Sequence, residues 1–400
     1  MPLATAEMAT SEIGVAGMTA VPQLRPDNIV PDPCGSLPVG VSATSLEGRL
    51  EMWCDVLFQA AQIFRDCRLA GTGWKRQVKF LRSYLLSVSE YGERTVGVVR
   101  PQDMNFSMAV PFGTTGDSSA RRQLRLACIF HIFHPEILRD FVDVLNRLPE
   151  DTDIFVSTDT EEKKALIMML FGSDSSGHLD VRVVLNRGRD IAPKLVTFRD
   201  EYKHYDLLLF LHSKRSTHWA DGEGWRRHLF HSLAGSSEIV TSIVDAFSTT
   251  TDLGMIIPQH WPQVVPWVDW QGEYDLARKI ASRIGIRLSR SHVVEHPSGS
   301  MFWARPAALA PLLSLGLEAD SFPEEAGQLA GTIAHAIERL FLYSCNAAGL
   351  WWAKVADPET ISHPRTAVQI AQPGEVKSFR DKHGFRLLVR SHSRRRAERQ

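Results

Sequence analysis

The segment DLLLFLHSK (206–214) is an almost continuous run of apolar residues that ends in three polar ones. Such a run is typical of a strand that is buried on both faces at the centre of a parallel sheet. Three strand-like segments precede it, LRLACIFHIF (124–133), DIFVSTDT (153–160) and LDVRVVLNRGRD (179–190), and helical patterns lie between them. Alternating strands and helices predict an α/β fold, with a mostly parallel, twisted sheet covered by helices.

The same alternation continues along the chain. Two later strands are predicted, LGMIIPQH (253–260) and GSMFWARPAAL (299–309). Helices are predicted where apolar residues recur at helical spacing and where acidic residues or proline occupy the first turn. They cover residues 135–148, 161–171, 191–205, 225–233, 236–247 and 327–343.

Composition limits the class of protein. The 400 residues include 45 Lys and Arg and 46 Asp and Glu, and the net charge of −1 argues against a protein that coats nucleic acid. With 44% hydrophobic residues, most of the chain can form a buried core. Five cysteines without a Cys-x-x-Cys pair suggest neither a disulfide framework nor a zinc module, so a reducing cytoplasm is the simplest location.

Four parts are predicted along the chain. Residues 1–44 are rich in proline and low in charge, which predicts a disordered leader. Residues 45–119 carry two helical patterns and a polar linker, residues 120–350 form the α/β domain, and residues 351–400 are a C-terminal extension. From residue 376 the tail holds nine Lys or Arg and two acidic residues, net +7, which predicts either a solvated end or a weak contact with anionic membrane.

Polar and charged residues follow the predicted strands at their carboxyl ends, the edge where open α/β sheets bind ligands. Each also has an ordinary local explanation, such as a helix cap, a turn or a solvated charge. Their occurrence on three successive strand ends favours a shared site, and the four cations among them favour an anionic ligand such as a phosphate. These residues are Thr158, Asp159, Asn186, Arg187, Gly188, Arg189, Asp190, His212, Lys214 and Arg215.

The stretch from about residue 124 to residue 350 resembles the rhamnan synthesis protein F family of bacterial polysaccharide glycosyltransferases. The matching phrases are FVSTDTEEKK, VVLNRGRDIAP, YDLLLFLHSKRS, GWRRHLFHSLAGS, PSGSMFWARPAAL, FPEEAGQ and GTIAHAIERLF. The order of these motifs is also similar to the nucleotide-sugar-binding fold called GT-A. The resemblance therefore implies a GT-A-like domain over residues 120–350, with an N-terminal helical extension.

The resemblance also implies a function. A member of this family is expected to transfer a sugar, rhamnose from a dTDP-sugar, to a growing cell-surface polysaccharide such as rhamnan or O-antigen. The implied partners are a nucleotide-sugar donor and a lipid-linked or polysaccharide acceptor, in the cytoplasm or on the inner face of the cell membrane. The alternative is a non-catalytic binding or scaffolding subunit of a polysaccharide synthesis complex, which has kept the fold and lost turnover.

The chain departs from the GT-A pattern where a divalent metal would bind. In that fold an acidic residue after the second strand meets the base, as Asp159 would, and a later strand ends in Asp-x-Asp, which holds Mg²⁺ or Mn²⁺ on the diphosphate. Here that strand ends in His212-Ser213-Lys214, so two carboxylates are missing where a hard cation needs them. We expect Lys214, helped by neighbouring arginines, to supply the positive charge. Dependence on Mg²⁺ or Mn²⁺ is the alternative.

The acceptor side is expected later in the chain. In the resembling fold an acidic residue at the start of a late helix removes the proton of the acceptor hydroxyl, and FPEE places Glu324 and Glu325 there, with Glu338 as a third candidate. Ala330 stands near the place where the family often has an acidic residue, and the glutamates could equally be helix N-terminal charges. Aromatic faces pack on sugar rings, although they also form hydrophobic clusters. The expected acceptor wall consists of Ser300, Trp303, Trp267 and Trp270.

Overall fold

A computed structural model of the chain describes a set of ranges from residue 106 onward, with Leu57, Ala61 and Val78 before them. The ranges are 106–113, 124–172, 177–214, 222–265, 268–270, 272–288, 294–327, 330–358, 360 and 366–384. The predicted leader and nearly all of the predicted helical extension lie outside these residues. By its internal contacts the chain divides into residues 1–48 and residues 49–400, and all of the described residues belong to the second unit.

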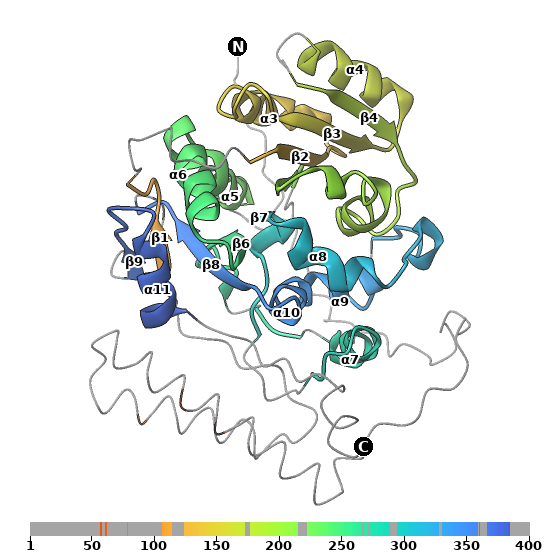
Figure 1. The fold of residues 1–400 in the computed structure, drawn as a ribbon. Coiled ribbons are helices and arrows are strands. Elements are labelled where there is room, and N and C mark those ends of the chain that lie inside the picture. Colours follow the sequence, from red (N-terminus) through yellow and green to blue (C-terminus); the bar gives the residue numbers. More distant parts are fainter. Residues whose placement is uncertain are drawn as a thin grey trace, which may run out of the picture. The chain divides into compact units, whose positions relative to one another are not determined.

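A nine-stranded sheet forms the centre of this unit (Figure 1), in the order β4-β3-β2-β5-β7-β6-β8-β1-β9. All strand pairs are parallel except those that β7 makes with β5 and β6. The strands are β1 (Ser107–Ala109), β2 (Leu126–His131), β3 (Asp153–Thr158), β4 (Leu179–Val183), β5 (Leu207–His212), β6 (Leu253–Pro258), β7 (Phe302–Ala304), β8 (Trp351–Ala356) and β9 (Ala367–Val368). The predicted mostly parallel α/β sheet is confirmed.

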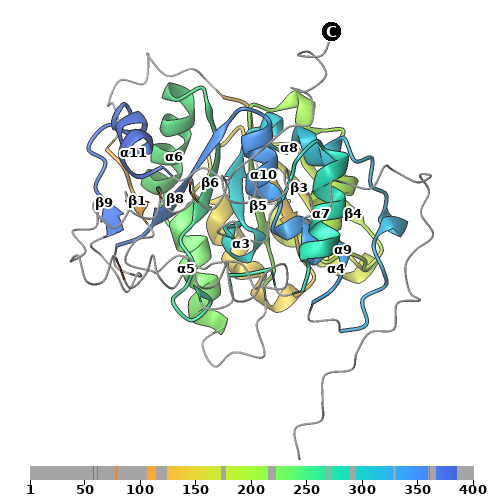
Figure 2. The ribbon, with the colours of Figure 1, turned by 90° about the horizontal axis from the view of Figure 1, so that it is seen from below.

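Helices cover both faces of the sheet (Figure 2). One face carries α3 (Leu138–Leu145), α4 (Glu161–Phe171), α5 (Gly222–Ala234), α6 (Ser237–Thr249) and α11 (Glu375–His383). The other carries α7 (Tyr274–Arg283), α8 (Pro306–Leu313), α9 (Ile333–Glu338) and α10 (Phe341–Ala347). Leu207, Leu209 and Leu211 of β5 pack in the first layer, while Leu208 and Phe210 pack in the second. Burial on both faces is why segment 206–214 is apolar at nearly every position.

Several predicted elements are confirmed and two differ. The segments 124–133, 153–160 and 253–260 contain β2, β3 and β6, and the helix predicted at 161–171 is α4. The segment 299–309 is mostly not a strand: β7 has three residues and α8 follows, because proline at residue 306 suits the first turn of a helix. The segment predicted as a helix at 191–205 holds a π-helical turn (Pro193–Thr197) and a 3₁₀ turn (Tyr202–His204).

The sheet extends beyond residues 120–350 at both ends of that range. The strand β1 comes from the predicted linker, and β8, β9 and α11 come from the predicted C-terminal extension. Every residue of β8 is buried, and Lys354, which interrupts its apolar pattern, pairs with Glu295 at 2.5 Å. The first residues of the basic tail are also ordered, because α11 buries Val376 and Phe379 against the sheet.

The order of the strands reverses between β2 and β5. The strands β3 and β4 lie on one side of β2, and β5 lies on the other with all the remaining strands. Such a reversal leaves a crevice at the carboxyl ends of the two strands, where α/β proteins bind ligands. His131 and His212, the last residues of β2 and β5, are register partners at this point. The 3₁₀ turn Ser298–Ser300, which precedes the antiparallel β7, lies at the same edge.

Candidate functional site

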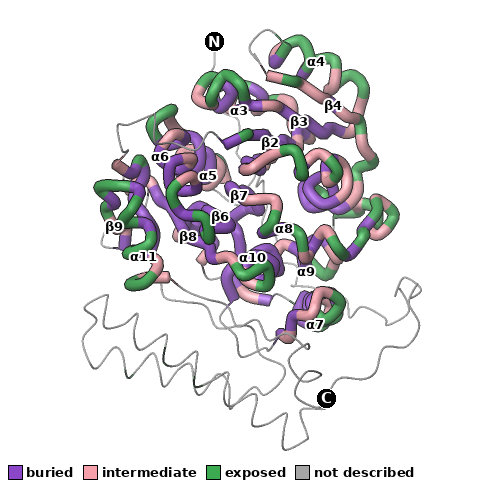
Figure 3. Tube along the Cα trace, in the orientation of Figure 1, coloured by how far each residue is buried: buried purple, intermediate pink, exposed green. Residues whose placement is uncertain are grey.

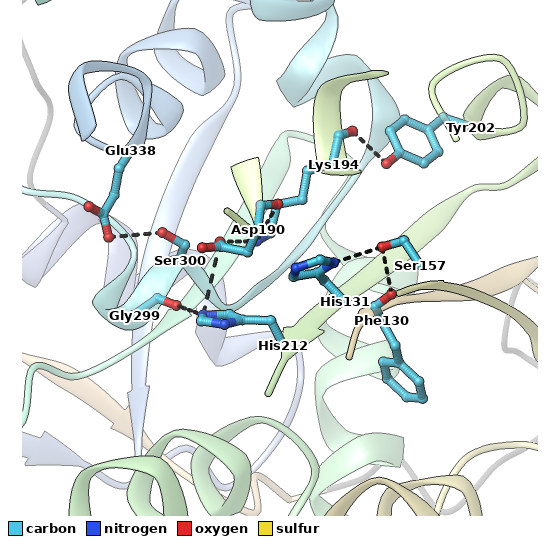
Figure 4. Close-up of polar contacts among 10 residues, drawn as sticks. All are labelled: Phe130, His131, Ser157, Asp190, Lys194, Tyr202, His212, Gly299, Ser300 and Glu338. Carbon is cyan, nitrogen blue, oxygen red and sulfur yellow. Dashed lines mark hydrogen bonds and ion pairs between the residues drawn. The ribbon is translucent and has the colours of Figure 1, made fainter. Parts of the chain in front are cut away.

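Asp190 lies among the polar side chains at this edge of the sheet (Figure 4), where it forms a buried ion pair with Lys194. The ammonium also donates to the backbone carbonyl of Asp190 at 3.3 Å, and the Asp190 Oδ2 atom lies 3.9 Å from Nε2 of His212. Only 2% of Lys194 and 9% of Asp190 are exposed. Burial alone would raise the pKa of Asp190, but its interactions with His212 and with the charged ammonium of Lys194 hold it well below its ordinary value. Asp190 is therefore ionised and forms an ion pair with the buried ammonium of Lys194.

A sharp turn of the backbone places Asp190 in this position. Gly188 and Arg189 both have positive φ angles, of 64° and 52°, and the π-helical turn follows directly. A Cβ atom on Gly188 would lie 2.4 Å from the ring of Phe322, so only glycine fits here. The Asn-Arg-Gly motif predicted from the sequence thus acts as a tight turn that brings the following aspartate under the sheet edge.

The two histidines at the strand ends are neutral and have defined tautomers. Nδ1 of His131 lies 3.0 Å from Oγ of Ser157, which in turn donates to the carbonyl of Phe130. The network assigns the proton to Nδ1 and leaves Nε2 as an acceptor. Nε2 of His212 lies 2.7 Å from the carbonyl of Gly299, so this nitrogen must donate. Burial lowers the pKa of His131 to about 3 and that of His212 to about 4.

Lys214 and Glu338 complete the ionised groups of the crevice. The Lys214 ammonium lies 4.1 Å from the centre of the Trp225 ring, and burial lowers its pKa while the charge of Glu338 opposes the fall. The Glu338 carboxylate accepts a hydrogen bond from Oγ of Ser300 at 2.8 Å. Burial acts to raise the pKa of Glu338, but His296 and Arg339 outweigh it, and the pKa lies below the ordinary value. Glu338 is therefore ionised at neutral pH.

Ser213, between His212 and Lys214, organises the loop that follows β2. Its Oγ atom accepts hydrogen bonds from the backbone N–H groups of Phe133 and His134, at 2.7 and 2.8 Å. The His-Ser-Lys segment thus contributes two ionisable side chains at this edge and one buried hydroxyl that fixes the backbone of the loop after β2.

The structure gives two of the predicted donor-binding residues local partners. The hydroxyl of Thr158, fully buried, donates to the carbonyl of Ile132 at 2.7 Å, so its side chain serves the loop between β2 and α3. Asp159 forms an ion pair with Lys163 at 2.6 Å, and the same ammonium lies 4.3 Å from the centre of the Phe133 ring. Asp159 remains half-buried at the edge of the crevice, where the sequence predicts it.

The predicted cations and the predicted bases pair with each other. Arg187 contacts Glu324 at 2.7 Å, and Arg189 contacts Glu325 at 3.3 Å. The Glu324 side chain is 81% exposed. Asn186, which precedes these arginines, is exposed as well. The structure therefore brings the two predicted groups together, but as partners that neutralise one another. Arg215 lies outside the described residues.

Of the predicted acceptor wall, only Ser300 faces the crevice among the described residues. Trp303 is fully buried and its indole donates to the carbonyl of Leu233 at 3.0 Å. Trp270 is 1% exposed and packs against Tyr274, with ring centres 5.5 Å apart. Both indoles are core residues, so neither faces an acceptor in this structure. Trp267 lies outside the described residues.

Sequence reasoning missed a buried cluster at the same edge. At the carboxyl ends of β6 and β8, His260 donates to Glu295 at 2.6 Å, and Lys354 binds the other oxygen of the same carboxylate. His296 packs edge-on to His260, with ring centres 5.3 Å apart. These four residues are all at most 7% exposed. In the sequence, the only indication of this cluster was His260, a histidine at the end of a predicted strand. Lys194 was missed too, although its i,i+4 spacing from Asp190 is typical of an ion pair on a helix.

The described residues of the crevice do not fit a divalent metal. After β5 they offer an imidazole whose N–H is bonded to Gly299 and an ammonium, whereas Mg²⁺ and Mn²⁺ prefer carboxylate oxygens. Asp190 is already held by Lys194. Within the described ranges, no group of three or more His, Cys, Asp and Glu side chains is arranged to hold a metal ion.

The chain is a mostly parallel α/β protein with polar side chains gathered at the switch point of its sheet, which is the place where α/β proteins bind their ligands. The chain belongs to the Rhamnan synthesis protein F family, whose match covers residues 89–350. The predicted resemblance is thus confirmed. The family is named for the synthesis of rhamnan.

Two relatives from Xanthomonas campestris pv. campestris, strains B100 and ATCC 33913, are both described as "Uncharacterized protein WxcX". Each is 35% identical to this chain over 216 residues, which is 53% of this chain and 30% of the relative. The chain therefore spans less than a third of the length of these relatives.

Among the helices of the described ranges, none is long and apolar enough to cross a membrane.

Proposed function

We propose that the protein is a glycosyltransferase that transfers a sugar, rhamnose from a dTDP-activated donor, to a growing cell-surface polysaccharide such as rhamnan or O-antigen. The family and the switch-point crevice support this proposal. The observation that carries it is the combination, at one sheet edge, of an ammonium on Lys214 with an ionised carboxylate on Glu338. Transfer of a sugar from a diphosphate needs both a cation for the leaving group and a base for the acceptor.

The donor is proposed to bind in a GT-A-like manner. Asp159, the turn at Gly188 and the His-Ser-Lys segment follow β3, β4 and β5, three parallel strands that are consecutive in the chain, so all three segments lie at the same edge of the sheet. Lys214 would stabilise the negative charge that develops on the diphosphate as the bond to the anomeric carbon breaks. Lys194 is proposed to act indirectly, since its charge is already balanced by Asp190. The reaction would then proceed without a divalent metal.

Glu338 is the proposed base. Glu324 and Glu325 are each paired with an arginine, and Glu324 lies mostly in solvent. Glu338 also lies near an arginine, 3.5 Å from Arg339, but it is half-buried at the strand ends and is oriented by the hydroxyl of Ser300. It would take the proton of the acceptor hydroxyl while that oxygen attacks the anomeric carbon and the diphosphate leaves. Direct displacement of this kind inverts the configuration at the anomeric carbon.

The acceptor is proposed to be lipid-linked or to be the polysaccharide itself, at the cytoplasmic face of the membrane. The first experiment is a thermal-stability panel of nucleotide sugars, followed by a transfer assay with the strongest binder. The proposal expects stabilisation by one class of nucleotide sugar and turnover that persists in chelator. Binding without turnover in wild-type protein would instead favour a scaffolding subunit.

A further inference from the structure

The exposed apolar side chains of the described ranges gather at one edge of the sheet. Among the described residues from 106 to 384, every large apolar side chain that is exposed belongs to α4, to the end of β4 or to the segment just after β4. These residues are Leu166 (36% exposed), Met168 (43%), Met169 (66%), Val183 (36%) and Leu185 (69%). The helix packs beside the strand, and both carry exposed segments (Figure 3). A cluster of this kind marks an interaction surface.

β4 is the edge strand of the sheet and presents an open row of backbone groups. Among the strands that the structure describes, it pairs with β3 alone. The carbonyl of His178 accepts from Ile154, and the N–H of Val184 donates to Thr158, so the even-numbered residues of the strand bond to β3. In a ladder the intervening groups point the other way. The N–H and C=O groups of Leu179, Val181 and Val183 therefore point toward the open edge, where another strand can bind.

The charges on β4 are complementary to those of a second copy of the same strand. Asp180 and Arg182 lie on one face of β4 and pair with each other at 2.7 Å, and Arg182 also binds Glu201 and stacks on Phe198. If two copies pair antiparallel around Val181, Asp180 of each copy lies opposite Arg182 of the other. Because even-numbered residues would form the non-hydrogen-bonded pairs, in which side chains are closest, these opposite charges would meet.

The apolar residues fit the same arrangement. In this register Leu179 lies opposite Val183, and each Val181 exchanges two backbone hydrogen bonds with its counterpart. A two-fold axis perpendicular to the sheet keeps each layer of helices on its own side, so the α4 helices of the two copies would lie on the same face. The exposed methionines and leucine of α4 would then flank the junction from both sides.

We propose that the β4 edge is a self-association surface, on which a second copy of the chain binds antiparallel around Val181 and joins two sheets into one. This surface is distant in sequence from Lys214 and Glu338, and the inference does not depend on sugar transfer. An isologous contact of this kind needs the same strand to match itself in both charge and shape, which the Asp180 and Arg182 pattern provides.

Sedimentation velocity over a wide range of concentration, with the full chain, tests the proposal. A reversible dimer is expected. Met169→Glu should raise its dissociation constant at least about tenfold, because the junction would bury two unpaired carboxylates. Ser378→Glu, an exposed position on α11 at the other end of the sheet, is the matched control and should leave dimerisation unchanged. Val183→Pro should also weaken the dimer, since the proline removes an outward N–H and leaves the bonds to β3 intact.

A charge exchange tests the register itself. Asp180→Arg alone and Arg182→Asp alone place like charges opposite each other and should each weaken self-association. An equimolar mixture of the two variants restores opposite charges at both positions and should form a heterodimer. The melting temperature of each variant identifies any loss of folding, since Arg182 also has partners in its own chain. A full chain that stays monomeric at every concentration, or a dimer that Met169→Glu and Val183→Pro leave unchanged, would overturn the proposal.

Discussion

Lys194 and Asp190 form an ion pair one helical turn apart, at the switch point of the sheet and almost out of reach of solvent. The pair exists because Gly188 and Arg189 turn the chain inward, after which a π-helical turn brings the ammonium back over the carboxylate. We propose that this pair holds His212 in position, while Lys214 contacts the ligand.

Removal of one partner of this pair should destabilise the protein strongly. Lys194→Met leaves the Asp190 carboxylate buried without a cation, and we expect a loss of about 3–5 kcal/mol in the free energy of unfolding, measured by urea denaturation. Arg187→Met is the control, because its partner Glu324 is 81% exposed and such pairs contribute at most about 1 kcal/mol. An equal loss in the free energy of unfolding for the two variants would show that the pair of Lys194 and Asp190 is not buried in the folded protein.

Acid should destabilise the protein through its buried histidines. In the unfolded chain a histidine takes up its proton near pH 6.5, while in the folded protein burial lowers the pKa of His131 to about 3 and of His212 to about 4. The unfolded state binds more protons below pH 6.5, so stability is lost as the pH falls from about 6.5 toward about 4. Each histidine contributes a slope of up to about 1.4 kcal/mol per pH unit.

Urea unfolding at a series of pH values measures this slope. His212→Gln keeps a donor for the carbonyl of Gly299 and removes the titrating group, so the curve should become shallower in that range. A variant whose slope equals that of the wild type would show that His212 titrates normally in the folded protein.

Gly188→Ala should destabilise the turn. The substitution puts a Cβ atom 2.4 Å from the Phe322 ring at a backbone φ of 64°, and we expect a loss of more than about 2 kcal/mol. Gly285→Ala is matched in conformation, with φ of 73°, but has no atom within 4 Å. It should cost only about 1 kcal/mol, the penalty of the backbone conformation. Thermal unfolding compares the two, and a similar shift for both would show that Phe322 moves aside.

Lys214→Met should weaken the binding of a nucleoside diphosphate. A charge-assisted contact contributes about 1.5–3 kcal/mol, so the dissociation constant of dTDP should rise by about tenfold to a hundredfold in calorimetric titration. Lys377→Met, at an exposed position of α11, is the control. We expect wild-type binding to be unchanged in chelator. Binding that requires Mn²⁺ would overturn the assignment of the charge to Lys214.

The sequence predicted the sheet better than it predicted the site. The apolar run from Leu207 to Leu211 lies within one short segment, and such a run is typical of a strand buried on both faces. The strand could therefore be predicted from the local sequence alone. The strand β8 was missed because Lys354 breaks its pattern, and the residue that satisfies this lysine, Glu295, lies 59 positions away. Local pattern carries no information about such a partner.

Contacts between distant loops account for the remaining differences. Arg187 and Glu324 are separated by 137 positions, so a single sequence cannot show that a predicted phosphate ligand and a predicted base form a pair. Trp303 was expected at an acceptor wall because tryptophan serves sugar binding and cores equally well. Only the register of β7 with β5 and β6 shows that its indole points into the core.

In the proposed reaction, Glu338 and Lys214 at the switch-point edge catalyse the transfer of a sugar without a divalent metal. The most direct measurement is the rate of rhamnose transfer from the dTDP-sugar by Glu338→Gln in chelator, compared with Glu324→Gln and wild type. We predict that Glu338→Gln lowers kcat by about a hundredfold to ten-thousandfold while the donor still binds, and that Glu324→Gln stays within a few-fold of wild type. Full activity of Glu338→Gln, with loss of turnover in Glu324→Gln, would show that Glu324 and not Glu338 is the base.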